Sequence, residues 1–139
     1  MADMNIEFLR LLGLAKRASR AELGEDGVSD AIAAGKARVI FLASDAAANS
    51  VRRVSYMTED SHAVVVSVPF TKAELGAACG RSSCAMMAIT ETGLAASAVE
   101  KLSLLSPGTY DQALQLVQAK DARIRSRRGK KKRTRKTNL

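Results

Sequence analysis

The sequence predicts an α/β fold, a three-layer α-β-α sandwich around a small mixed four-stranded sheet. Two observations lead to this prediction. Short apolar, partly β-branched runs alternate along the chain with helical patterns. The runs are apolar at consecutive positions, which is typical of strands covered on both faces. With 139 residues, the chain has the size of one ordinary domain and can bury well over half of its unfolded surface.

The four strands are expected at 21–24, 39–43, 63–68 and 84–90. The first is a short extended piece, and the other three are apolar runs. Pro69 ends the third strand, because proline has no N–H to give to a strand ladder.

The core helices are expected at 6–18, 25–34, about 49–58, 72–79 and 94–102. Gly35 ends the second of them, as a glycine after a helix commonly does. Asp45 or Asn49 is expected to cap the third. Thr71 is expected to cap the fourth, with Glu74 as its capping-box partner.

The C-terminal part begins with a turn at 106–108 and continues into a further helix, whose apolar stripe contains Tyr110, Ala113, Leu114 and Val117. The stripe either packs on the core, which is the favoured interpretation, or binds a partner. From residue 127 onward, like charges without apolar residues before Leu139 predict an unordered segment. The expected division is therefore a domain at 1–105, a helix at 106–126 and a disordered basic tail at 127–139.

The net charge of +8 comes entirely from the C-terminal segment 123–139, which includes the tail. Ten of the 22 Lys and Arg residues fall within 123–139, which contains no acid. The remaining 12 face 14 acids, so the rest of the chain carries a net charge of −2. Such a tail is a ligand for phosphate backbones, because each neutralised phosphate releases counterions. The alternatives are a solvated tail that aids solubility and a nuclear address.

The start of the second helix is a candidate anion site. Gly24 gives a tight turn directly before the helix, and the first helical N–H groups have no partner within the helix. These groups and the positive end of the helix dipole favour an anion such as a nucleic-acid phosphate.

Five blocks of the sequence, in this order, resemble the kink-turn-binding ribosomal proteins typified by archaeal L7Ae, and most closely their bacterial YlxQ-type branch. The blocks are R-L-L-G-L-A-K-R-A at 10–18, the stretch 24–35, V-I-F-L-A-S-D-A at 39–46, T-K-A-E-L-G at 71–76 and A-C-G-R-S-S-C-A-M-M-A-I at 78–89. The resemblance covers about the first hundred residues. It implies a non-catalytic, cytoplasmic RNA-binding protein whose partner is structured RNA, first of all ribosomal RNA.

The resemblance also implies two contact surfaces. In the family the block Gly-x-Asn-Glu-x-Thr-Lys reads the G·A pairs of the kink, and here Asp26, Gly27 and Asp30 stand in the places of Asn, Glu and Lys. Ala34 replaces an arginine that often precedes the closing glycine. These changes remove amide donors and turn an attraction to phosphate into a repulsion. The second surface is the loop from Gly80 to Cys84, expected beside Gly24, in which Arg81 can stack on a base or bind a phosphate.

The predicted RNA-binding residues belong to the two surfaces and the tail. They are Gly24, Glu25, Asp26, Gly27, Ser29, Asp30, Lys36, Arg81, Ser82, Ser83, Arg127, Arg128, Lys130, Lys131, Lys132, Arg133, Arg135 and Lys136. Recognition by shape and backbone is favoured over base stacking, because the chain has no Trp, two Tyr and three Phe.

The sequence gives little support for catalysis or metal binding. The only histidine, His62, is expected to be structural, and Cys79 and Cys84 match no usual zinc spacing. A nucleophile at Ser83 or Cys84 with His62 as its base stays open. We predict no enzyme, cofactor, metal or small-molecule substrate. Neither a signal peptide nor an apolar run of roughly 18 residues is visible, so a soluble cytoplasmic monomer without membrane contact is expected.

Two other functions stay open. One is a protein-interaction module that keeps the fold, binds a basic protein surface through its acidic Gly24 region and uses the tail only for nonspecific RNA association. The other is an accessory domain for an RNA-modifying enzyme.

Overall fold

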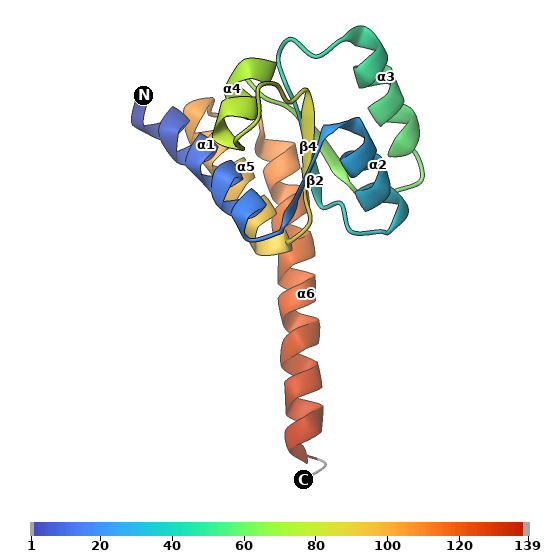
Figure 1. The fold of residues 1–139 in the computed structure, drawn as a ribbon. Coiled ribbons are helices and arrows are strands. Elements are labelled where there is room, and N and C mark those ends of the chain that lie inside the picture. Colours follow the sequence, from blue (N-terminus) through green and yellow to red (C-terminus); the bar gives the residue numbers. More distant parts are fainter. Residues whose placement is uncertain (1, 138–139) are drawn as a thin grey trace.

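The computed structural model describes the backbone of residues 2–137 and the side chains of residues 5–128. Its helices and strands alternate as expected, and Figure 1 shows their arrangement. The elements are α1 (Ala2–Arg17), β1 (Ala21–Leu23), α2 (Gly24–Ala33), β2 (Val39–Leu42), α3 (Ala48–Met57), β3 (Val64–Ser67), α4 (Lys72–Ala78), β4 (Met86–Ile89), α5 (Thr92–Leu105) and α6 (Asp111–Thr137).

The four strands form one mixed sheet in the order β1-β4-β2-β3. Strands β2 and β3 run parallel, whereas β4 is antiparallel to both β1 and β2. The two ends of the sheet can therefore be named by the strands that start or stop there. We call the end where β1 stops and β4 starts the Gly24 end, and the end where β1 and β2 start and β4 stops the Arg38 end.

Helices cover both faces of the sheet, which confirms the three-layer sandwich. On one face, Phe8 of α1 and Leu75 of α4 pack with Phe41 of β2, and buried residues of α5 and α6 complete this cluster. On the other face, Val28 of α2 and Val54 of α3 pack on β2 and β4. Successive residues of β2 point to opposite faces, and all four are buried. This explains the unbroken apolar run in the sequence.

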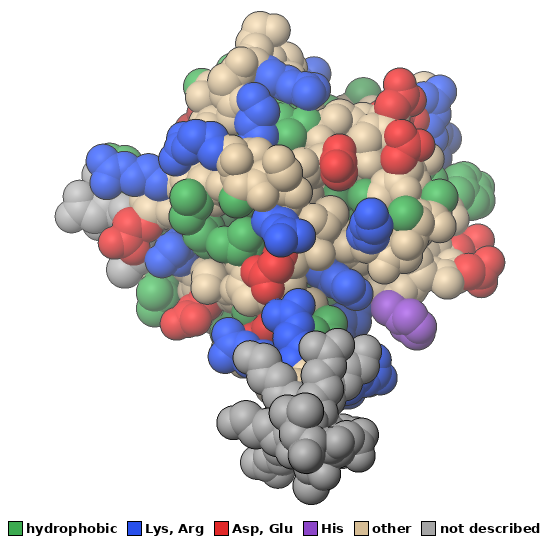
Figure 2. Space-filling view, turned by 60° about the horizontal axis from the view of Figure 1, so that its bottom comes forward, with side chains coloured by type: hydrophobic (Ala, Val, Ile, Leu, Met, Phe, Trp, Pro, Cys, Tyr) green, Lys and Arg blue, Asp and Glu red, His purple; other side chains and the backbone are tan. Residues whose placement is uncertain are grey.

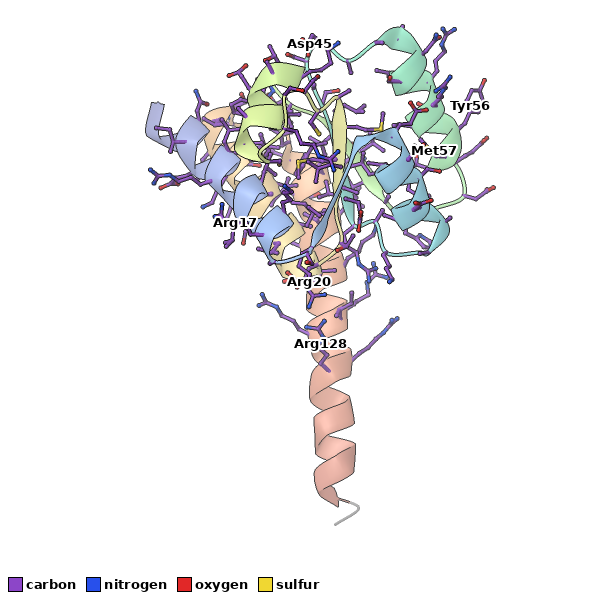
Figure 3. All side chains as sticks on the ribbon, viewed as in Figure 1. Arg17, Arg20, Asp45, Tyr56, Met57 and Arg128 are labelled. Carbon is purple, nitrogen blue, oxygen red and sulfur yellow. The ribbon has the colours of Figure 1, made fainter. Side chains whose placement is uncertain are left out.

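The capping of the helices differs in part from the sequence prediction. The capping box of α4 is confirmed: the Thr71 hydroxyl accepts from the Glu74 N–H, and the Glu74 carboxylate accepts from the Thr71 N–H. The predicted cap of α3 is wrong, because α3 starts after Ala47 without a side-chain cap. Asp45 instead accepts from the N–H of Lys72 at 2.8 Å and so ties the β2–α3 loop to the start of α4 (Figure 3).

The first part of α6 packs on the core, as favoured from its apolar stripe. Tyr110 and Val117 are buried in the larger cluster, and the Tyr110 hydroxyl donates to the Ser67 carbonyl at 3.0 Å. The backbone then stays helical to Thr137 and projects from the domain (Figure 1). The sequence predicts an unordered segment there; Lys and Arg are good helix formers, however, and the docked first turns supply the costly helix nucleus.

Candidate functional site

The structure brings the Gly24 turn and the Gly80 loop together at the Gly24 end of the sheet. Gly24 lies between β1 and α2 with a φ of +79°, a conformation that strains other residues. A Cβ atom at position 24 would lie 4.0 Å from Nη1 of Arg81. Arg81, Ser82 and Ser83 are all exposed. The pairing of β1 with β4 produces this neighbourhood, because Gly24 directly follows β1 and the Gly80 loop leads into β4.

The start of α2 has no side-chain cap. Its N-cap residue, Leu23, has no side chain that can accept from the first helical N–H groups. Arg81 adds a guanidinium beside these donors. Backbone N–H groups and a guanidinium both match phosphate oxygens, so this place has the chemistry of an anion site.

The Gly80 loop is held tightly by α4. The Arg81 N–H donates to the Gly76 carbonyl at 2.7 Å, and the Cys84 N–H donates to the Lys72 carbonyl at 2.9 Å. A Cβ atom at position 76 would lie 2.8 Å from the Arg81 carbonyl oxygen and from the backbone of Ser83. The loop is therefore preorganised, and only glycine at position 76 allows it to lie so close to α4.

We expect Gly76→Ala to lower the free energy of unfolding by about 1 kcal/mol or more, because the added methyl group must push the loop backbone away. Urea unfolding of the two proteins measures the loss. Gly27→Ala is the matched control: its Cβ atom would meet Glu22 no closer than 3.5 Å, and alanine is favoured over glycine in a helix. A Gly76→Ala protein as stable as the parent would contradict the tight loop packing.

The acidic residues of the predicted site lie in two different surroundings. Glu25 pairs with Arg53 of α3 at 2.7 Å, so it ties two helices together. Asp26 and Asp30 are exposed on α2. The carboxylate of Glu22 reaches across from β1, because its Oε2 atom would lie 3.6 Å from a Cβ atom at Gly27. The exposed side of α2 and β1 is therefore acidic.

Three predicted residues line a groove at the Arg38 end of the sheet. Lys36 follows α2, Asp30 lies on α2 and Arg128 lies on α6; Arg20 and Arg38 line the groove with them. Figure 3 labels Arg20 and Arg128 there. Sequence reasoning missed Arg20 and Arg38. The signal was their place directly before β1 and β2, since strands that run in the same direction start at the same end of a sheet.

The tail residues of the predicted site are described only in part. Arg127 and Arg128 are exposed on α6. The side chains of Lys130, Lys131, Lys132, Arg133, Arg135 and Lys136 lie outside the described residues.

Most aromatic rings are removed from solvent. Phe8, Phe41 and Phe70 are buried, and the Phe8 ring packs against both of the others with centroid distances of 5.3 Å. Tyr110 is also buried, whereas Tyr56 on α3 is 75% exposed (Figure 3). Four of the five rings are thus unable to stack on a base.

The arrangement does not support the catalytic alternative. Val39 of β2 is opposite both Val64 and Ile89, so His62, just before β3, lies at the Arg38 end of the sheet. Ser83 and Cys84, just before β4, lie at the Gly24 end. The two groups are separated by the length of the strands. Burial also raises the pKa of the Cys84 thiol, and likewise that of Cys79, which disfavours a thiolate nucleophile.

Within the part of the chain that the structure describes, no three His, Cys, Asp or Glu residues are grouped so as to hold a metal ion. Of the helices described, none combines the length and the apolar character that a membrane span needs.

Comparisons with known proteins agree with the sequence resemblance. The profile of the family described as "Ribosomal protein L7Ae/L30e/S12e/Gadd45 family" matches residues 7–99. The RNA-binding protein YlxQ of Bacillus subtilis (strain 168) is 32% identical over 94 residues, which are 65% of this chain and 89% of YlxQ.

Solved structures show the same fold. A Bacillus halodurans protein of unknown function has a TM-score of 0.64 and 25% identity, over 69% of this chain and 96% of its own. The Giardia lamblia 15.5kD RNA binding protein has a TM-score of 0.60 and 23% identity, over 74% of this chain and 90% of its own. The five sequence blocks therefore indicated the right family. The chain belongs to the ribosomal protein L7Ae/L30e/S12e/Gadd45 family.

Proposed function

We propose that this chain is a non-catalytic RNA-binding protein of the kink-turn type that docks structured RNA at the Gly24 turn and the Gly80 loop. In this proposal, residues 1–105 form the RNA-binding domain, residues 106–126 brace it, and the basic tail at 127–139 binds neighbouring phosphates. The RNA is ribosomal, and the protein acts as a cytoplasmic monomer associated with the ribosome.

The observation that carries this proposal is the position of Arg81 beside the uncapped start of α2. Its Nη1 atom is 4.0 Å from the place of a Cβ atom at Gly24. A phosphate at this turn would receive backbone N–H groups and a guanidinium together. Because the Gly80 loop is fixed by its hydrogen bonds to α4, this geometry costs little ordering when RNA binds.

The relatives support the same function. YlxQ of Bacillus subtilis is named an RNA-binding protein, and the family takes its name from ribosomal proteins. The buried aromatic rings fit recognition of a folded RNA by shape and backbone better than stacking of single-stranded bases. The separation of His62 from Ser83 and Cys84 fits a protein that binds without catalysis.

One observation favours a second candidate, a protein-interaction module. The first turn of α2, directly after Gly24, carries the two carboxylates of Glu25 and Asp26, and Asp26 is exposed. Carboxylates there repel phosphate and attract a basic protein surface. In this alternative the tail contacts RNA nonspecifically and the domain binds a protein.

Binding to a kink-turn RNA and to a plain duplex of equal length separates the two functions. We expect the kink-turn RNA to be bound more tightly at every salt concentration, because the duplex offers only phosphates. Equal affinity for both would leave only nonspecific binding and would favour the interaction module.

A further inference from the structure

A groove of about 670 Å³ lies at the Arg38 end of the sheet, between the domain and α6. Its cationic lining comes from three parts of the chain: Arg20 before β1, Lys36 and Arg38 before β2, and Arg128 on α6. Figure 2, which brings the base of the molecule forward, shows Lys and Arg side chains gathered there, with some acidic ones among them. The Gly24 turn and the Gly80 loop lie at the opposite end of the sheet, and of the residues predicted for that surface only Asp30 also lines the groove.

The strand ladder fixes the backbone of Arg20 and of Arg38. The Thr90 N–H donates to the Arg20 carbonyl at 2.9 Å, and the Arg38 N–H donates to the Ile89 carbonyl at 2.9 Å. Both arginines therefore flank the end of β4. Their positions are set by backbone hydrogen bonds of the sheet and do not depend on a mobile loop.

A polar contact sets α6 against this end of the sheet. The hydroxyl of Thr92, the first residue of α5, donates to the Asp121 carboxylate at 2.9 Å, and Asp121 also pairs with Arg125 at 3.1 Å. Both Thr92 and the Asp121 side chain are largely buried, so the contact specifies the register of α6. Lys120, one residue before Asp121, is half-buried on α6.

Lys120 stands among other cations. Burial lowers the pKa of its ammonium group, and the nearby guanidinium groups of Arg38 and Arg123 lower it further. Like charges that are held together in a partly buried place repel one another, and an anion between them relieves the repulsion.

The acids of the groove do not neutralise these cations. The Glu91 carboxylate accepts from the N–H groups of Gly93 and Leu94 at 2.9 and 2.7 Å, so it caps α5. Glu22 and Asp30 also line the groove. Within residues 5–128, no carboxylate oxygen lies within 4.0 Å of the charged nitrogens of Arg20, Lys36, Arg38, Lys120 or Arg128.

The side chain of Arg38 also has a hydrogen-bond donor without a partner. Its Nε atom is buried and has no hydrogen-bond partner among the described residues. A buried donor without a partner costs free energy, and an anion in the groove can accept from it.

We propose that this groove is a second nucleic-acid contact, which clamps the phosphates of an RNA strand between the domain and α6. The clamp is a feature of this chain beyond its family domain, because the family profile ends at residue 99 and α6 begins at Asp111. The volume lies in the range of sites that enclose small ligands, so phosphates fit together with their riboses. The inference rests on the proposed function only in naming RNA as the source of the phosphates.

The test compares Arg20→Gln and Arg38→Gln, both in the groove lining, with Lys101→Gln in the full chain. Lys101 is a matched control, because it lies on α5 and contacts Glu7, away from the groove. Affinity for a plain RNA duplex is measured over a salt series. Each groove variant is expected to bind a few-fold more weakly and to lower the slope of log affinity against log salt by about one, whereas Lys101→Gln leaves the slope unchanged.

Two further readouts make the result specific. Without RNA, Arg20→Gln is expected not to lower the midpoint of urea unfolding, because the exposed Arg20 side chain forms no ion pair among the described residues; a merely structural arginine would lower the midpoint. The preference for a kink-turn RNA over the duplex is expected to stay the same in the groove variants, so the groove and the Gly24–Gly80 surface are tested separately.

The proposal is overturned if both groove variants keep the salt slope of Lys101→Gln. A second test adds 5′-AMP at concentrations that leave the RNA binding of the tail intact. The groove is not an RNA site if 5′-AMP protects the full chain against unfolding and also removes the difference in salt slope between the groove variants and Lys101→Gln. That outcome would assign the groove to a free nucleotide.

Discussion

A chain that ends at Ala122 is expected to lose nearly all of its affinity for a plain RNA duplex at low salt. The removed segment contains ten Lys and Arg residues and no acid, and the remaining chain has a net charge of −2. If about six phosphate contacts form, the affinity of the full chain falls roughly a thousandfold between 50 and 200 mM salt, because each contact releases counterions. The shortened chain is expected to show almost no salt dependence.

Fluorescence anisotropy with a labelled duplex measures both slopes. The shortened chain keeps Tyr110 and Val117, the buried anchors of α6, and the Asp121 contact to Thr92, so circular dichroism should show an intact domain. A shortened chain with the full slope would mean that the domain, and not the segment after Ala122, holds the duplex.

The double substitution Asp26→Asn and Asp30→Lys is expected to raise the affinity for a kink-turn RNA. The two side chains are exposed, so the change should leave the fold intact. It shifts the charge of the α2 surface by three units. At a distance of roughly 6 Å in water, three unit charges contribute about 2 kcal/mol with a phosphate, which corresponds to roughly thirtyfold in affinity. Position 27 is left unchanged, because a glutamate there would lie beside the Glu22 carboxylate.

The control for this gain carries the same charge change at another exposed place. Asp60→Asn with Glu59→Lys alters the turn after α3, where both residues are exposed. The larger gain is expected for the α2 variant on the kink-turn RNA; a smaller gain of this variant on the duplex is also expected, because Asp30 lines the groove. An equal gain in affinity in the control would mean that the effect comes from the net charge of the protein and not from the α2 surface. No gain in either variant would mean that RNA does not contact α2.

The sequence predicted those features that are encoded by neighbouring residues. The buried strand at 39–42 follows from four consecutive apolar side chains, and the capping box of α4 follows from Thr71 and Glu74 three residues apart. The turn at Gly24 was expected from a glycine between an extended piece and a helix, and the structure gives this residue a positive φ. The neighbourhood of Arg81 and Gly24 came from the family resemblance, since no local pattern joins residues so far apart in the chain.

Features that depend on tertiary contacts were missed. Asp45 has the residue type of an N-cap for α3, but the fold brings the N–H of Lys72 within its reach. Lys36 seemed to belong to the Gly24 turn because it is near in sequence, yet α2 carries it to the opposite end of the sheet. The groove depends on the strand order and on the position of α6 together, so its cations, Arg20, Lys36, Arg38 and Arg128, do not form one group in the sequence.

The preference of the chain ending at Ala122 for a kink-turn RNA over a duplex of equal length tests the central claim most directly. Without the basic segment, only the domain remains to recognise RNA. The account predicts that the shortened chain still binds the kink-turn RNA and ignores the duplex, through Gly24 and Arg81. Loss of binding to both RNAs, with the domain still folded, would contradict it and would leave the tail as the only part of the protein that contacts RNA.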